Sequence, residues 1–123
     1  MNRLKVEAGA ASFEIELDDS ATSQAIVKAL PFESRASTWG EEVYFSTPVS
    51  ARLEANAKQV VEPGTVCFWT QGDSIALPWG RTPISTDDMP KLANPCSVLG
   101  KIVGSFSVLK DIRPNARIRV TKA

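Results

Sequence analysis

The chain has 123 residues, and its fourteen basic and fourteen acidic side chains leave no formal net charge. Because attraction to phosphate backbones needs an excess of positive charge, we expect no nucleic-acid partner. No apolar run approaches the ~20 residues of a membrane span, and the N-terminal residues do not resemble a signal peptide. We therefore expect no membrane association, a cytoplasmic location and a single domain, residues 1–123.

The absence of histidine excludes several kinds of catalytic site. Neither Ser-His-Asp nor Cys-His catalysis is available, nor is a histidine zinc site. Cys67 and Cys96 lack a CxxC spacing, so both are predicted to stay reduced, with Cys96 in a turn after Asn94-Pro95. The acidic residues Asp73, Asp87 and Asp88 lack the spacing of a calcium loop. We predict neither a metal nor any other cofactor.

The first third of the chain predicts a hairpin, a helix and a loop. Apolar and polar residues alternate over residues 3–8 and 12–18, which is typical of two strands with one solvated face, joined by a turn. Apolar residues then recur at helical spacing over 21–30, after Ser20 and before Pro31. One face of this helix is expected to plug the end of a barrel. Residues 32–38 are polar and predict a loop.

Short strands dominate the rest of the prediction. In the strand over 41–45, Val43 and Phe45 share one face while Glu42 and Tyr44 share the other. Residues 53–61 fit a short helical turn, whereas Val49, Ala51 and Leu53 fit a strand that continues from Phe45, and we favour a strand followed by a turn. The remaining elements are a hairpin with strands over 65–70 and 74–79, a loop over 84–95, a strand over 97–103, a helix over 106–112 and a strand over 116–122.

This order of elements indicates a mainly β domain with antiparallel strands. The pattern alone leaves a barrel and a sandwich open. In a barrel of about eight strands the side chains fill the interior, so a site would lie on the outer wall or at the rim.

Five blocks of the sequence form a recognisable set in this order: Ala29-Leu30-Pro31, residues 39–45, Val60-Val61 before Pro63-Gly64, residues 80–84 and residues 98–104. Together they resemble the small prokaryotic cyclophilin-like proteins. The resemblance implies a closed antiparallel cyclophilin-like β-barrel of about eight strands with two short helices, related in fold to peptidyl-prolyl isomerases. The chain departs from the family pattern at Phe68, Thr70-Gln71 and Pro78-Trp79, where a different ligand preference is expected.

Aromatic residues near the strand ends are the candidate ligand-binding groups. Indole and phenol rings combine apolar area with a polar group, although each ring also fits ordinary core or rim packing. Glu42 shares the face of Tyr44, and partial burial there would raise its pKa, whereas a solvated strand carboxylate is the commoner case. The candidate ligand-binding residues are Trp39, Glu42, Tyr44, Trp69, Trp79 and Thr82.

The favoured function is binding of a small apolar ligand or a proline-containing peptide in an aromatic cleft. One alternative is peptidyl-prolyl isomerisation, in which Arg35 or Arg81 would polarise the amide, although a solvated arginine in a loop is the favoured interpretation of both residues. The Phe-His-Arg strand motif of true cyclophilins is absent. A further alternative is a non-catalytic interaction protein whose aromatic patch is covered in a homo-oligomer.

Overall fold

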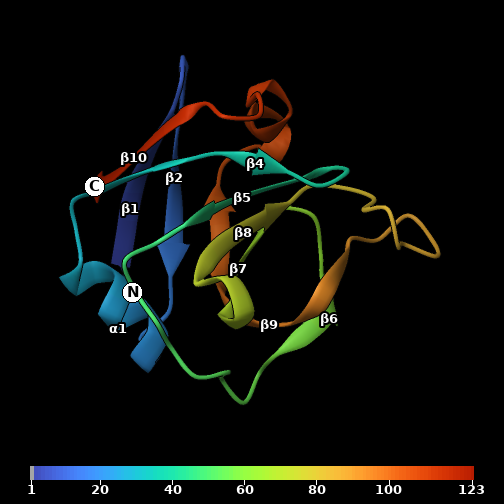
Figure 1. Cartoon of the computed structure of the whole chain (residues 1–123), viewed down its shortest axis with the longest axis horizontal. Coiled ribbons are helices and arrows are strands. Elements are labelled where there is room, and N and C mark those ends of the chain that lie inside the picture. Colours follow the sequence, from blue (N-terminus) through green and yellow to red (C-terminus); the bar gives the residue numbers. More distant parts are fainter. Residues whose placement is uncertain (1) are drawn as a thin grey trace.

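The computed structural model describes residues 2–123 as a nearly closed antiparallel barrel (Figure 1). Neighbouring strands follow the order β3-β10-β1-β2-β9-β7-β8-β5-β4, and β6 pairs with β9 outside this path. The strands are β1 (Asn2–Ala8), β2 (Ala11–Leu17), β3 (Phe32–Arg35), β4 (Ser37–Thr38), β5 (Glu42–Ser46), β6 (Lys58–Val60), β7 (Thr65–Trp69), β8 (Ser74–Pro78), β9 (Lys91–Val103) and β10 (Arg117–Lys122). This confirms the mainly β antiparallel barrel predicted from the sequence.

The N-terminal hairpin shows how the period-two pattern sets the register. Leu4 pairs with Ile15 and Val6 with Phe13, so the apolar residues of both strands enter the same core. The alternating polar residues face solvent, where Arg3 forms an ion pair with Glu16 at 3.4 Å. The predicted hairpin is therefore confirmed.

The barrel closes without a continuous backbone ladder between β3 and β5. These strands approach each other across the seam, and the Ser34 and Ser46 hydroxyls form a hydrogen bond of 3.1 Å. On its other edge β3 pairs with β10. A polar groove, described below, lies along this seam.

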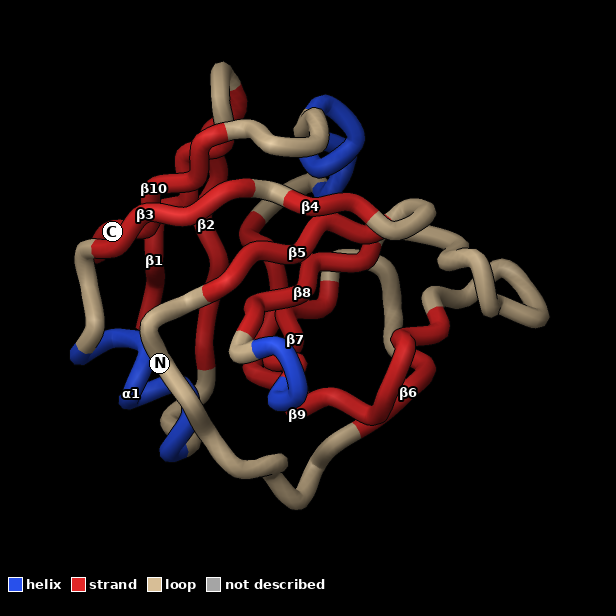
Figure 2. Tube along the Cα trace, in the orientation of Figure 1, coloured by secondary structure: helices blue, strands red, loops and turns tan. Residues whose placement is uncertain are grey.

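Short helices lie at the two ends of the barrel (Figures 1 and 2). Helix α1 (Ala21–Lys28) begins at Ser20, whose hydroxyl accepts a hydrogen bond from the Ser23 amide, and its Ile26 is fully buried in the main core. The predicted helix and its plugging role are confirmed. The 3₁₀ helix η2 (Phe106–Asp111) takes the place of the second predicted helix, and another 3₁₀ turn, η1 (Thr70–Gly72), joins β7 to β8. Among residues 2–123, no helix is long and apolar enough to span a membrane.

Two local predictions were wrong in the segment before residue 54. Residues 32–38, predicted as a loop, contain β3 and β4, because pairing with β10 and β5 overrides their polar composition. Residues 49–53, predicted as a strand, have no regular structure. Val49 is nevertheless buried, and the Thr47 hydroxyl accepts a hydrogen bond from its amide at 3.1 Å.

The predicted loop over 84–95 also ends too late. β9 begins at Lys91, so Asn94 and Cys96 lie in a strand rather than in a turn. Pro95 suggested a break because it lacks a backbone donor. The register between β6 and β9 shifts in this region, from Lys58 opposite Cys96 to Val60 opposite Lys91, and the proline is accommodated in that irregular stretch.

Gly100 provides a test of the strand packing. A Cβ atom at this position would overlap the backbone carbonyl of Glu16 on β2, so Gly100→Ala should force two paired strands apart. We expect a loss of more than about 3 kcal/mol in the free energy of unfolding, measured with urea. The matched control is Gly9→Ala, where a φ of +60° adds strain but the nearest atom is 3.8 Å away, and a loss of about 1–2 kcal/mol is expected. Equal losses in the two variants would contradict the close approach of β2 and β9.

Candidate functional site

The outer face of β7 and β8 is buried as well as the inner face. Their inner residues, such as Phe68 and Leu77, belong to the main core, whereas Cys67 and Ala76 belong to a second apolar cluster outside the barrel wall. The first half of β9 and the segment around β6 cover this face. The second cluster contains Val61, Cys67, Ala76, Leu92 and Cys96, with Tyr44, Trp69 and Val98 packed against it.

A pocket of about 250 Å³ opens beside this second cluster. It brings together four of the six predicted ligand-binding residues from three different segments. Because the second cluster lies outside the barrel wall, the pocket is on the outer wall, one of the two places expected for a site in a barrel. We call it the aromatic pocket. Its lining residues are Trp39, Glu42, Tyr44, Trp69, Ala76, Leu92, Ala93 and Cys96.

The tight turn between β4 and β5 places Trp39 at the pocket. The Trp39 amide donates a hydrogen bond of 3.0 Å to the Glu42 carbonyl, which fixes the two lining residues relative to each other. Gly40 makes this turn with a φ of +60°, and a Cβ there would come within 2.8 Å of the Pro83 ring. Only glycine meets both conditions without rearrangement.

Tyr44 and Trp69 form two walls that meet almost at a right angle. Their ring centroids are 6.0 Å apart and the ring planes are inclined by 82°, an edge-to-face arrangement. The Trp69 indole N–H donates a hydrogen bond of 3.1 Å to the Asn94 side chain on β9. This bond holds the ring in place and occupies its polar atom.

Glu42 is the one charged residue among those lining the aromatic pocket. It is only 7% exposed, and its Oε1 has no hydrogen-bond partner among the described residues. Burial raises the pKa of this carboxyl from 4.5 to about 7. A group with this pKa exchanges a proton readily near neutral pH, as a general acid or base requires.

Neither cysteine is activated for nucleophilic chemistry. Both thiols are free, as predicted, and both are buried. Burial raises the pKa of Cys96 to about 12 and raises that of Cys67 as well. The thiolate is the reactive form of cysteine, so Cys96 contributes a neutral, apolar wall to the pocket.

Two predicted ligand-binding residues lie outside the pocket lining. Trp79 packs against the main core, because it follows the inward alternation of Ile75 and Leu77 on β8. Thr82 is buried, and its hydroxyl hydrogen-bonds to the Lys91 carbonyl. Its amide donates a bond of 2.9 Å to the Ser85 hydroxyl. Thr82 thus ties together the loop that leads into β9.

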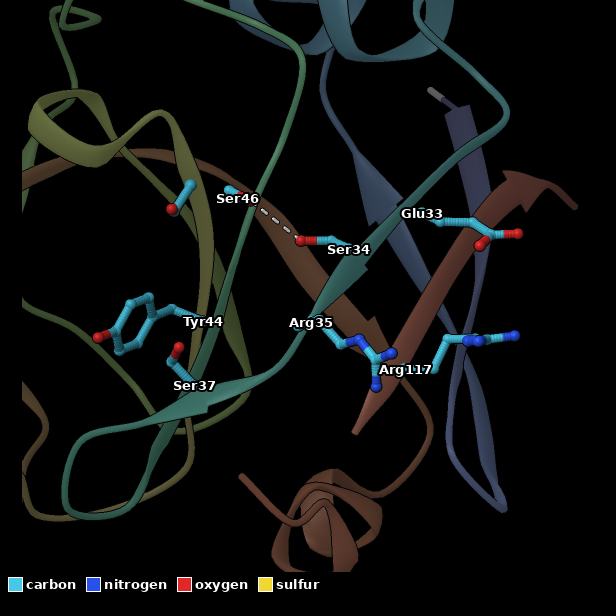
Figure 3. Close-up of a pocket in the computed structure, with 8 residues that line it drawn as sticks. Glu33, Ser34, Arg35, Ser37, Tyr44, Ser46 and Arg117 are labelled. Atoms are coloured by element: carbon cyan, nitrogen blue, oxygen red, sulfur yellow. Dashed lines mark hydrogen bonds between the residues drawn. The ribbon is translucent and has the colours of Figure 1, made fainter. Parts of the chain in front are cut away.

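The two candidate arginines also lie outside the aromatic pocket. Arg35 lines an open groove of about 570 Å³ along the barrel seam, with Tyr44 on the opposite side (Figure 3). Its guanidinium donates a hydrogen bond of 3.1 Å to the Asn115 carbonyl. Arg81 is exposed in the loop after β8 and lies 3.8 Å from Asp88. The groove is lined by Glu33, Ser34, Arg35, Ser37, Tyr44, Ser46, Ser74 and Arg117.

Sequence reasoning missed the contribution of β9 to the pocket. Leu92, Ala93 and Cys96 line it, and Asn94 orients Trp69. All four lie in or next to the segment predicted as a loop. Apolar and polar residues do not alternate over residues 92–94, and Pro95 favours a loop, so the local sequence gives no strand signal here. Ala76 was missed because every residue of β8 is buried, so the sequence does not show which face each occupies.

The raised pKa of Glu42 predicts a pH-dependent stability. The folded protein retains a proton on this carboxyl up to about pH 7, whereas the unfolded chain releases it near the ordinary value of 4.5. Between these values the unfolded state binds fewer protons, so the free energy of unfolding falls as the pH rises, by about 3 kcal/mol in total. The glutamine of Glu42→Gln does not titrate, so its free energy of unfolding lacks this fall. Measured with urea, the stability of Glu42→Gln relative to wild type should therefore rise between pH 5 and pH 8, by up to about 3 kcal/mol.

The matched control is Glu41→Gln, which removes one exposed carboxylate from the neighbouring residue. After correction with this control, the free energy of unfolding of Glu42→Gln relative to wild type should change with pH. A value that stays constant from pH 5 to pH 8 would contradict the burial of the Glu42 carboxyl.

Comparison with known proteins places the chain in a family. A family model described as cyclophilin-like matches residues 2–121. The structure is similar to the solution structure of a hypothetical protein from Archaeoglobus fulgidus, with a TM-score of 0.86, 39% sequence identity and coverage of 99% of this chain and 95% of that chain. No curated protein matches the chain. The chain therefore belongs to the cyclophilin-like family.

Proposed function

We propose that this protein binds a small, mainly apolar ligand in the aromatic pocket. The observation that carries the proposal is the pocket itself, with Trp39, Tyr44 and Trp69 around a buried carboxyl. Ligand sites are typically concave and apolar, with few polar groups that fix the orientation of the ligand. The aromatic pocket has this composition.

The size of the pocket limits what can enter. Its volume of about 250 Å³ is smaller than the roughly 300–1,000 Å³ of pockets that hold drug-sized molecules. A small molecule or a single side chain of a peptide, such as a proline ring, is the appropriate occupant. The walls are held in advance by the Trp69–Asn94 bond and the Gly40 turn, which reduces the entropic cost of binding.

Prolyl isomerisation receives less support from the geometry. The barrier to rotation of the peptide bond is roughly 18–20 kcal/mol, and a shared fold does not supply the groups that lower it. Arg35 does not line the aromatic pocket but an adjoining polar groove that shares Tyr44 with it, and Arg81 lies in an exposed loop. We therefore propose binding without turnover.

Indole N–H signals in NMR spectra test the proposal, with benzyl alcohol and an acetylated Ala-Pro amide as separate probes. We expect at least one probe to shift the signals of Trp39 and Trp69, which line the pocket, and to leave that of Trp79 unchanged. Cis–trans exchange of the Ala-Pro peptide, followed in the same samples, should not accelerate. Acceleration would show turnover and would contradict the proposed absence of catalysis.

A blocking variant provides the control. Ala93 is exposed at the edge of the pocket, so Ala93→Trp should fill the entrance without disturbing the core and should abolish the shifts. Ala10→Trp places the same side chain on the exposed β1–β2 turn and should leave them intact. Shifts that persist in Ala93→Trp, or no shift with either probe at millimolar concentration, would contradict the proposed site.

A further inference from the structure

The unpaired carboxyl oxygen of Glu42, a residue that lines the aromatic pocket, restricts the kind of ligand that fits. Glu42 Oε1 is buried without a hydrogen-bond partner among the described residues, and a buried acceptor left unpaired is costly. A purely apolar occupant would leave this oxygen unpaired and shield it further from water. A ligand group that carries an N–H donor removes that cost.

The aromatic walls add a preference for positive charge. The faces of Trp and Tyr rings attract cations, and Tyr44 and Trp69 present two rings inclined by 82°. The indole N–H of Trp69 is already bound to Asn94, so it does not place a competing donor in the pocket. None of the lining residues is basic, and Glu42 is the one residue there that can carry charge near neutral pH. The electrostatic field therefore favours a cation.

The apolar walls of the pocket also require that the cation carry apolar groups. A bare ammonium is strongly hydrated, and Ala76, Leu92 and Cys96 offer it no replacement for water. Alkyl groups on the nitrogen reduce this hydration and contact the apolar walls. At least one N–H must remain, however, to donate to Glu42.

We propose that the ligand of the aromatic pocket carries a secondary or tertiary alkylammonium group, which donates its N–H to Glu42 and packs its alkyl groups against Trp39, Tyr44 and Trp69. This inference rests on the proposed function and adds the chemical class of the ligand. A methylated amine, free or at the end of a side chain, belongs to this class.

Three probes of similar shape separate the contributions of the positive charge and of the N–H group to the affinity. Dimethylethanolamine is cationic with one N–H, choline is cationic without an N–H, and 3,3-dimethylbutan-1-ol is neutral. Titration calorimetry at pH 8 should rank them in that order, with the neutral alcohol at least tenfold weaker than dimethylethanolamine. Glu42→Gln should reduce the affinity for dimethylethanolamine at least tenfold and leave that for the alcohol nearly unchanged. Glu41→Gln, the matched control, should change neither.

The affinity for dimethylethanolamine should also fall more than tenfold between pH 8 and pH 5.5, because protonated Glu42 loses its negative charge while the amine keeps its own. The titratable groups that face Glu42 are the thiols of Cys67 on β7 and Cys96 on β9, together with Tyr44 on its own strand. Burial raises the pKa of both thiols, so they stay neutral over this range. If the affinity of Glu42→Gln for dimethylethanolamine fell equally between pH 8 and pH 5.5, Glu42 would not be the group that binds the cation.

The outcomes distinguish this inference from the proposed function. Binding of the neutral alcohol as tightly as the amine, blocked by Ala93→Trp, would overturn the alkylammonium class and retain the apolar ligand site. Choline binding as tightly as dimethylethanolamine would overturn the N–H contact to Glu42. Absence of binding by all three probes would overturn the alkylammonium inference. The proposed function would fall with it only if the benzyl alcohol and Ala-Pro probes also failed.

Discussion

The candidate site depends on the covering of one outer face of the barrel. In a closed barrel the outward side chains normally meet water, yet Cys67 and Ala76 on β7 and β8 are buried on that side. The long strand β9 makes this possible, because its second half pairs within the barrel while its first half pairs with β6 outside it. This cover supplies apolar walls on the outside of the barrel, and the aromatic pocket opens beside it.

This arrangement accounts for the unusual environment of Glu42. The residue stands at the start of β5, where an outward position would ordinarily be solvated. Glu42 is instead buried and lines the same pocket as Tyr44, Ala76 and Cys96, and its pKa rises because burial removes water from the carboxyl. Burial of an unpaired carboxyl reduces stability, and the proposed ligand would offset part of this cost by pairing with it. The fold thus holds an unpaired carboxyl among the apolar residues that line the pocket.

Local patterns predicted most of the barrel and half of the pocket. Alternation placed Glu42 and Tyr44 on one face of a strand and Val43 and Phe45 on the other, which is what the structure shows. The cover was missed because it depends on pairing between β6 and β9, which are more than thirty residues apart, and because Pro95 resembles a loop signal. Trp79 was not separated from Trp69 because β8, the strand before it, is buried on both faces.

The titration of Glu42 tests the central claim most directly. In the protein labelled with ¹³C at the glutamate carboxyl carbons, the account predicts one resonance that titrates near pH 7, assigned to Glu42 by its loss in Glu42→Gln. A Glu42 resonance that titrates near the ordinary value of 4.5 would contradict the account, because it would show a solvated carboxyl and hence no covered polar atom in the aromatic pocket.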